Sequence, residues 1–152
     1  MFYEIITNQA LMVPVSAWTI AQLTKMSIAL MQGKGLDFRY MVSSGGMPSA
    51  HSAVVTALAT TVGMTQGIGS ALFGATVILA MIVMYDAAGV RQSVSQQSVV
   101  LNRIVRELRL RHSITSLEAD MRELIGHTPF QVIVGAVSGL VLAWLWITIA
   151  AM

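Results

Sequence analysis

The chain has 152 residues, of which 55% are hydrophobic and only 11% are charged, and it has no cysteine. Soluble domains carry about 25% charged residues, so this composition excludes a disordered chain and a basic nucleic-acid-binding arm and favours an integral membrane protein. The missing cysteines exclude thiol chemistry, disulfides and cysteine-ligated metals. The 11 methionines fit packing and lipid contact better than a metal site, because no ligand cluster accompanies them.

The charged residues are clustered, and no Asp, Glu, Lys or Arg occurs in 5–24, 40–85 or 124–152. A membrane-spanning helix needs about 20 mostly apolar residues, so the first and last of these stretches fit one span each. The middle stretch fits two, because glycines divide it, and its first half is rich in Ala and Thr, as in a helix shielded from lipid. We therefore predict a single all-α domain, an integral membrane helical bundle. Its four transmembrane helices are predicted over about 8–31, 50–65, 68–88 and 129–151.

Two polar segments separate the predicted spans. The first, residues 32–49, is rich in turn-forming glycines, and Ser49 is expected to cap the helix that follows it. The second, residues 89–126, places five apolar side chains on one helical face and most of its arginines on the others, which predicts an amphipathic helix at the membrane surface or against the bundle. A capping-box pattern from Thr115 to Glu118 predicts a second short helix there. The five apolar residues are Val100, Leu101, Ile104, Val105 and Leu108.

With four spans, both polar segments lie on the same side of the membrane. Most of the basic residues fall between Arg91 and Arg122, so the positive-inside tendency places that side in the cytoplasm and both termini outside. The first residues lack the basic start of a cleavable signal, so we expect a mature N-terminus. The expected partners are membrane lipids and, through residues 89–126, partner membrane proteins, whereas no nucleic acid is expected.

Four ionisable residues lie in or beside the predicted spans, namely Lys25, His51, Asp86 and His127. Charge at membrane depth is costly and usually faces a partner or a cavity. Each of these residues also has a purely structural interpretation. Lys25 can snorkel from the end of the first span, and either histidine can be a hydrogen-bonded residue at a helix end. Asp86 can form an ion pair with Arg91 or Lys25.

The neighbours of the two histidines favour an anion site. The sequence GGMPSAHSA combines a glycine-rich turn, a helix start and His51, and backbone N–H groups at a helix N-terminus bind anions. The sequence IGHTPFQV places His127 just before Pro129, which opens the last predicted span. Arg39 and Arg91 lie on the same predicted side of the membrane. Together these groups would form a receptor for a phosphate group, while their spacing alone leaves the chemistry open.

Four segments of the chain resemble, in their order, the divergent branch of the type 2 phosphatidic acid phosphatase family, also called acid phosphatase/vanadium-dependent haloperoxidase-related proteins. The segments are SSGGMPSAHSAVVTALA, MYDAAGVR, QQSVVLNRIV and ELIGHTPFQVIVGAVSG. The resemblance extends from about Gln22 to the C-terminus, and GGMPSAHSA followed by GHTP is its specific part. It implies a helical membrane phosphohydrolase that needs no metal and no cofactor and reacts through a phosphohistidine.

The resemblance implies catalytic roles for three residues of this chain. His127 looks like the nucleophile that attacks phosphorus, and His51 looks like the general acid that protonates the leaving oxygen. A neutral imidazole is a good nucleophile only when its other nitrogen donates to an acceptor. Gln131 stands where the family commonly has a carboxylate for this purpose, and it lies one turn from His127 if the last helix begins before Pro129. Its carbonyl can accept a hydrogen bond but cannot offset the positive charge on the imidazole.

The resemblance also implies phosphate-binding residues and reveals further departures from the family pattern. The residues that look like phosphate ligands are Lys25, Arg39, Ser49 and Arg91, whereas Asp86 is assigned a structural polar role. Gln92 stands where a second arginine is common, Ser95-Gln96 where Gly-Glu is common, and Ala50 where Gly or Ser is usual. Most of these departures remove charge, so the fold would be kept while the electrostatics of the site are weakened.

Two functions of different classes are consistent with these observations. The first is a phosphatase-like protein of weakened or lost activity, acting on a lipid phosphate or pyrophosphate at the cytoplasmic face, with the lipid tail between the spans. The second is a non-catalytic structural subunit of a larger membrane complex, which the changes at positions 92, 96 and 131 favour, with residues 89–126 as its docking surface. A transporter or channel component is disfavoured, because the chain has few spans and no repeated broken helices.

Overall fold

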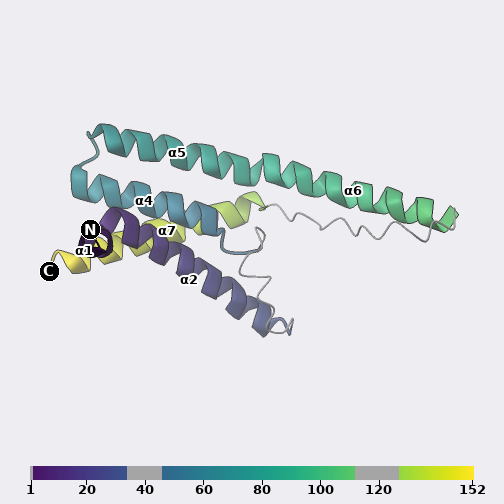
Figure 1. Ribbon diagram of the computed structural model, residues 1–152, viewed down its shortest axis with the longest axis horizontal. Coiled ribbons are helices and arrows are strands. Elements are labelled where there is room, and N and C mark those ends of the chain that lie inside the picture. Colours follow the sequence, from purple (N-terminus) through teal and green to yellow (C-terminus); the bar gives the residue numbers. More distant parts are fainter. Residues whose placement is uncertain (1, 34–45, 112–126) are drawn as a thin grey trace.

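The computed structural model describes residues 2–33, 46–111 and 127–152 (Figure 1). Every regular element in these ranges is an α-helix, which confirms the predicted all-α class. The helices are α1 (Phe2–Thr7), α2 (Gln9–Met31), α4 (Ala50–Gln66), α5 (Ala71–Ala88), α6 (Val90–Arg111) and α7 (Pro129–Ala150). Helices α2, α4, α5 and α7 occupy the ranges predicted as spans, and α6 contains the predicted amphipathic helix. The short helix predicted from Thr115 lies outside the described residues.

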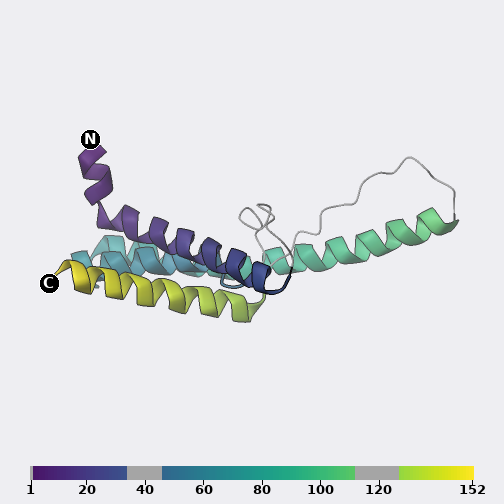
Figure 2. The same ribbon diagram turned by 90° about the horizontal axis from the view of Figure 1, so that it is seen from below.

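Helix α4 is the central helix of the bundle, and α2, α5 and α7 all pack against it. Figures 1 and 2 show the N- and C-termini at one end of the bundle and α6 extending beyond the other end. Within the described part of the chain, α6 contacts the bundle only through α5, whose direction it continues (Figure 1). The molecule is therefore a helical bundle with one long helical arm.

Serine side chains define where α4 and α5 begin. The Ser49 hydroxyl accepts a hydrogen bond from the Ser52 backbone N–H at 3.4 Å, and the Ser70 hydroxyl accepts one from the Phe73 backbone N–H at 3.1 Å. Each bond satisfies an N–H group that has no partner within the helix, and the cap predicted at Ser49 is confirmed. Gly67 has a φ angle of +85°, which residues with a side chain rarely adopt, so a tight turn joins the two helices and α5 begins after the predicted start of its span.

Glycines on α7 allow it to approach α4 closely. An added Cβ on Gly135 would overlap the carbonyl oxygen of Ser49, and one on Gly139 would overlap the Oγ1 atom of Thr56. The Thr56 hydroxyl in turn donates a hydrogen bond to the carbonyl oxygen of Ala136 at 3.0 Å. Small residues spaced four apart are a common means of close helix packing in membranes. The sequence GAVSG carries this signal, which adds to the motifs described above.

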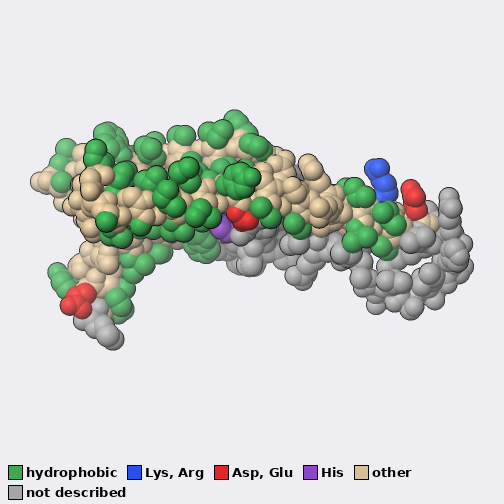
Figure 3. Space-filling model, turned by 90° about the horizontal axis from the view of Figure 1, so that it is seen from above, with side chains coloured by type: hydrophobic (Ala, Val, Ile, Leu, Met, Phe, Trp, Pro, Cys, Tyr) green, Lys and Arg blue, Asp and Glu red, His purple; other side chains and the backbone are tan. Residues whose placement is uncertain are grey.

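Small side chains fill the interior of the bundle, and large apolar side chains cover its outside. The core cluster consists of Val13, Ala17, Ala21, Ala50, Ala53, Ala57, Ala143 and Ile147. On the outside, Ile82 of α5 and Phe130 of α7 are both exposed, and Figure 3 shows apolar side chains over much of the bundle. Contiguous apolar surface of this kind is rare on soluble monomers but suits contact with lipid.

Two helical stretches of the described chain are long and apolar enough to cross a membrane. They are Ala71–Val105, which runs from α5 into α6, and Pro129–Ala150, which is α7. Helix α4 has only 17 residues and is enclosed by its neighbours, as expected for a helix shielded from lipid. Helix α2 carries the buried polar residues Gln22 and Lys25. The crossing of the membrane by all four bundle helices therefore stays a prediction.

Candidate active site

Four segments that are far apart in the sequence meet at one end of the bundle, because consecutive bundle helices run in opposite directions (Figures 1 and 2). These segments are the second half of α2, the first turn of α4, the last turn of α5 and the start of α7. They carry the described candidate residues Lys25, Ser49, His51, Asp86, His127 and Gln131. Arg39 lies outside the described residues, and Arg91 is placed in the first turn of α6 without a described side chain.

His51 and His127 are neighbours in the structure. Their ring centroids lie 6.1 Å apart, and their ring planes are inclined by 58°. His51 is exposed in the first turn of α4, whereas His127, directly before the N-cap of α7, has only 2% of its surface exposed. A small group that enters from the side of His51 therefore meets that imidazole first and reaches the ring of His127 only when the atoms that cover it move aside. This proximity depends on how α4 packs against α7, which the sequence does not specify.

Ser49 joins the N-terminus of α4 to the start of α7. Its side chain is fully buried, and its backbone N–H donates a hydrogen bond to the carbonyl oxygen of Gln131 at 3.2 Å. Its hydroxyl also accepts a hydrogen bond from the Ser52 hydroxyl at 3.0 Å. Ser49 therefore helps to hold together the two segments that carry the histidines, and its contact with a phosphate stays a prediction.

Gln131 belongs to the cap of α7. Its Oε1 atom accepts a hydrogen bond from the Thr128 backbone N–H at 3.0 Å, and its own N–H donates to the Thr128 Oγ1 at 3.3 Å. These two reciprocal bonds form a capping box. Because α7 begins at Pro129, His127 lies outside the helix, and the one-turn spacing considered for residues 127 and 131 does not apply.

Lys25 lies beneath the glycine-rich segment that leads into α4. Only 7% of its surface is exposed, and an added Cβ on Gly46 would come within 3.8 Å of the Lys25 Cδ. Gly46 has a φ angle of +91°, which lets the backbone pass closely over the lysine stem. Lys25 is therefore covered by the segment that carries the GGMPSAH motif, rather than snorkelling into open solvent.

Asp86 is half-buried in the last turn of α5. Lys25 and Arg91 are the ion-pair partners that the sequence makes available to it. Within the described chain, α2 and α5 both pack on α4, and their backbones do not approach one another closely.

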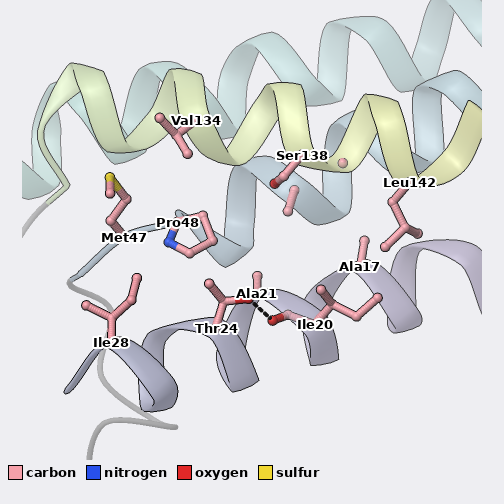
Figure 4. Close-up of a pocket in the computed structure, with 12 residues that line it drawn as sticks. Ala17, Ile20, Ala21, Thr24, Ile28, Met47, Pro48, Val134, Ser138 and Leu142 are labelled. Atoms are coloured by element: carbon pink, nitrogen blue, oxygen red, sulfur yellow. Dashed lines mark hydrogen bonds between the residues drawn. The ribbon is translucent and has the colours of Figure 1, made fainter. Parts of the chain in front are cut away.

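A cavity of about 230 Å³ lies between α2 and α7, with Met47 and Pro48 at one end (Figure 4). Its walls are mostly apolar and come from three helices and the segment before α4. The lining residues are Ala17, Ile20, Ala21, Thr24, Ile28, Met47, Pro48, Ala53, Val134, Ser138, Gly139 and Leu142. Because Pro48 directly precedes Ser49, the cavity ends beside the N-terminus of α4. The sequence indicates no such cavity, because it forms only when these helices pack.

The sequence profile of the Divergent PAP2 family matches residues 6–142, so the chain belongs to this family. The chain is also 35% identical over 148 residues to YuiD, an uncharacterized membrane protein of Bacillus subtilis (strain 168), and the match covers 91% of this chain and 94% of YuiD. No solved structure matches the chain significantly. The family resemblance found in the sequence is confirmed, and the chain is an α-helical membrane protein.

Proposed function

We propose that this member of the Divergent PAP2 family is a metal-independent phosphohydrolase of weakened or lost activity, whose substrate is a lipid phosphate or pyrophosphate. The observation that carries the proposal is the proximity of His51 and His127, whose ring centroids lie 6.1 Å apart. Two imidazoles that contact one phosphate can supply both a nucleophile and a general acid. The N-terminus of α4 adds backbone N–H groups that favour a bound anion.

The proposed reaction proceeds in two steps. First, an imidazole nitrogen of His127 attacks phosphorus, an N–P bond forms, and the bond from phosphorus to the ester oxygen breaks while protonated His51 donates its proton to that oxygen. Then neutral His51 takes a proton from water, the water oxygen attacks phosphorus, and phosphate leaves as His127 is regenerated. Lys25, Arg39 and Arg91 are proposed to bind the phosphate oxygens.

Two features of the site support a slow enzyme. His127 is almost fully buried, so a phosphate must displace some of its surroundings before the nucleophile can react. Gln131 uses its carbonyl oxygen to cap α7 and has no negative charge to stabilise an imidazolium. In the serine-protease triad, replacing the orienting carboxylate by its amide lowers turnover about 10⁴-fold, which indicates how much such a charge contributes.

The activity is tested with the full-length protein in nanodiscs, by phosphate release from phosphatidic acid and from a prenyl pyrophosphate. We expect slow release that vanadate inhibits and that His127→Ala or His51→Ala lowers about 100-fold, the range for loss of acid–base or nucleophilic groups. His112→Ala removes the remaining histidine of the chain and serves as the matched control, with unchanged release. Release that persists in His127→Ala contradicts the mechanism.

The cavity between α2 and α7 supports a lipid substrate, because an alkyl chain can occupy it while the phosphate stays at the N-terminus of α4. Ser138 lines the cavity, whereas the side chain of its neighbour Val137 is 56% exposed. Ser138→Phe is expected to raise KM for a long-chain phosphate about fourfold, since each methylene that loses its contact costs ~0.8 kcal/mol. Val137→Phe is the matched control, and an equal rise in both variants contradicts an acyl site here.

The alternative function, a structural subunit of a membrane complex, is favoured by α6. This arm exposes apolar side chains, among them Val100, Leu101 and Ile104, to its surroundings. If the double variant Gln131→Glu/Gln92→Arg releases no phosphate, while the native protein purifies with a stoichiometric partner, the structural function is supported and the enzyme is excluded.

We also propose that the site end of the bundle faces the cytoplasm, with both termini outside. The chain has no cysteine, so a single introduced cysteine reports its own location. Thr65 is exposed near the turn at the opposite end of α4. Thr65→Cys is expected to react with a membrane-impermeant maleimide in intact cells, and reaction only after permeabilisation would contradict this orientation.

A further inference from the structure

The antiparallel pairing of α4 and α5 places Asp86 level with the start of α4. The ring of Phe73 lies against Gly63, where an added Cβ would be 2.9 Å from the ring. Both helices rise by about 1.5 Å per residue, and Ala50 lies as many residues before Gly63 as Asp86 lies after Phe73. Asp86 is therefore level with Ala50 and its neighbour His51.

The helical repeat turns Asp86 and His51 toward the same side of this helix pair. Ser52 lies about three helical turns before Gly63, so both face α5, and Ala87 belongs to the buried side of α5. His51 and Asp86 each precede one of these inward-facing residues, which offsets them by about 100° around their helices. Because the two helices run in opposite directions, equal offsets turn both side chains to one side of the pair.

Burial and surface features agree with this placement. Asp86 is half-buried, His51 is exposed, and neither is without an interaction partner. On the α5 side of the molecule, which Figure 3 views, both acidic and histidine side chains reach the surface. His127 is close to His51, with the two ring centroids 6.1 Å apart, and it directly precedes α7, which contacts both α4 and α5. One end of the bundle therefore brings together a half-buried carboxylate, an exposed imidazole and a buried imidazole.

Building on the function proposed above, we infer that Asp86 is the positioning residue of the histidine pair. Its carboxylate holds the ring of His51 and supplies from α5 the negative charge that Gln131 lacks. Such a carboxylate fixes the ring orientation and the nitrogen that carries the proton, and it stabilises the imidazolium that acts as the acid. Asp86 transfers no proton and contacts neither substrate nor phosphorus. The competing interpretation is an ion pair between Asp86 and Arg91 at the start of α6.

The wild-type protein provides the first test, by solid-state NMR of the full-length chain in lipid. The distance from the Asp86 carboxyl carbon to the nearer ring nitrogen of His51 is expected to be about 4 Å or less, the range of a direct contact between these groups. A distance beyond about 6 Å overturns the inference, because an opposite charge then no longer acts directly on the ring. This measurement needs neither turnover nor a variant that folds.

Substitutions provide the second test, through the ¹⁵N signals of the histidine rings. Asp86→Asn is expected to change the tautomer pattern of His51 and leave His112 as in the wild type, and Asp86→Glu is expected to keep the wild-type pattern. Arg91→Gln removes the competing partner and is expected to leave the His51 signals unchanged. Unchanged His51 signals in Asp86→Asn, or the same change in Arg91→Gln, overturn the inference.

Kinetics separate this inference from the proposed function. Where turnover is measurable, Asp86→Asn is expected to lower kcat about tenfold or more. KM should change little, because the phosphate contacts are kept. Asp86→Glu is expected to recover part of the loss in kcat. Wild-type kcat in Asp86→Asn overturns the positioning role. Absence of turnover both in the wild type and in Gln131→Glu/Gln92→Arg refutes the enzyme instead, while the two NMR tests still decide whether Asp86 holds His51.

Discussion

Helices α6 and α7 both have 22 residues but are held in the molecule in opposite ways. A capping box starts α7, and its glycines allow it to pack closely along α4. In contrast, α6 continues from α5, and in the described structure it packs along no other helix. Helix α7 brings His127 close to His51, whereas α6 carries most of the arginines. The proximity of the two histidines therefore rests on one close helix contact, whereas the far part of the arm extends beyond the bundle and can change without disturbing them.

The largest expected effect comes from adding a side chain within the close contact between α7 and α4. Gly135→Ala places a Cβ against the backbone of Ser49, and overpacking of this kind typically lowers the free energy of unfolding by about 1–3 kcal/mol. Thermal unfolding in detergent micelles measures the loss. Gly74→Ala on α5 is the matched control, because an added Cβ there meets nothing within 4 Å. Equal destabilisation by both substitutions would show that the α4–α7 contact is no closer than the rest of the bundle.

The next effect concerns catalysis at the start of α7. Gln131→Glu keeps the capping box, since glutamate is a standard residue at this position, and adds a negative charge at the start of α7, on the side of His127. If the remaining site is intact, we expect phosphatase activity to rise about tenfold, equivalent to ~1.4 kcal/mol in the barrier. Adding Gln92→Arg from the arm should raise it further by restoring a phosphate contact. Brisk turnover by the unmodified protein, abolished by His127→Ala, would instead show that the native site is not weakened.

A smaller effect is expected from removing the cap of α7. Thr128→Ala deletes the hydroxyl that accepts from the Gln131 N–H, and the loss of such a cap costs about 1 kcal/mol of stability. Thr148→Ala is the matched control, because that hydroxyl bonds only within the body of the same helix, to the Trp144 carbonyl oxygen. Chemical unfolding of both variants measures the difference. If the cap also positions His127, phosphatase activity should fall in Thr128→Ala and not in Thr148→Ala.

Sequence patterns predicted the helices better than the site. Gaps between charged residues located the bundle helices, because burial in lipid excludes charge over whole spans, and Ser49 was recognisable as a cap. The role of Gln131 was missed, although Thr128-Pro-Phe-Gln131 has the same capping-box pattern that was recognised at Thr115, with Pro129 as the first helical residue. Three further features depend on helix register and packing. They are the proximity of His51 and His127, the position of Asp86 level with the start of α4, and the cavity beside Pro48. These are set by contacts such as Gly135 on Ser49, where the GAVSG pattern indicates a close helix contact but specifies neither the partner helix nor the register.

The smallest effect on stability is expected in the arm. Leu101 is exposed on α6, so Leu101→Ser should change the free energy of unfolding by no more than about 0.5 kcal/mol. Leu142→Ser on α7 is the matched control, because Leu142 packs against the core cluster and its loss should cost more than about 1 kcal/mol. If Leu101→Ser unfolds the protein as readily as Leu142→Ser, the arm is part of the bundle, and the contrast between α6 and α7 is wrong.

The same pair of variants sharpens the choice between enzyme and subunit. A partner that binds α6 should be lost from the purified complex in Leu101→Ser, because a serine in the apolar face removes the buried side chain on which such a contact depends. Leu142→Ser should retain that partner as long as it folds. An enzyme that acts alone predicts a different result, namely unchanged phosphate release and unchanged mass of the purified particle in Leu101→Ser. Because the exposed face around Leu101 can be altered without moving the histidines, Leu101→Ser separates the two functions and leaves the site intact.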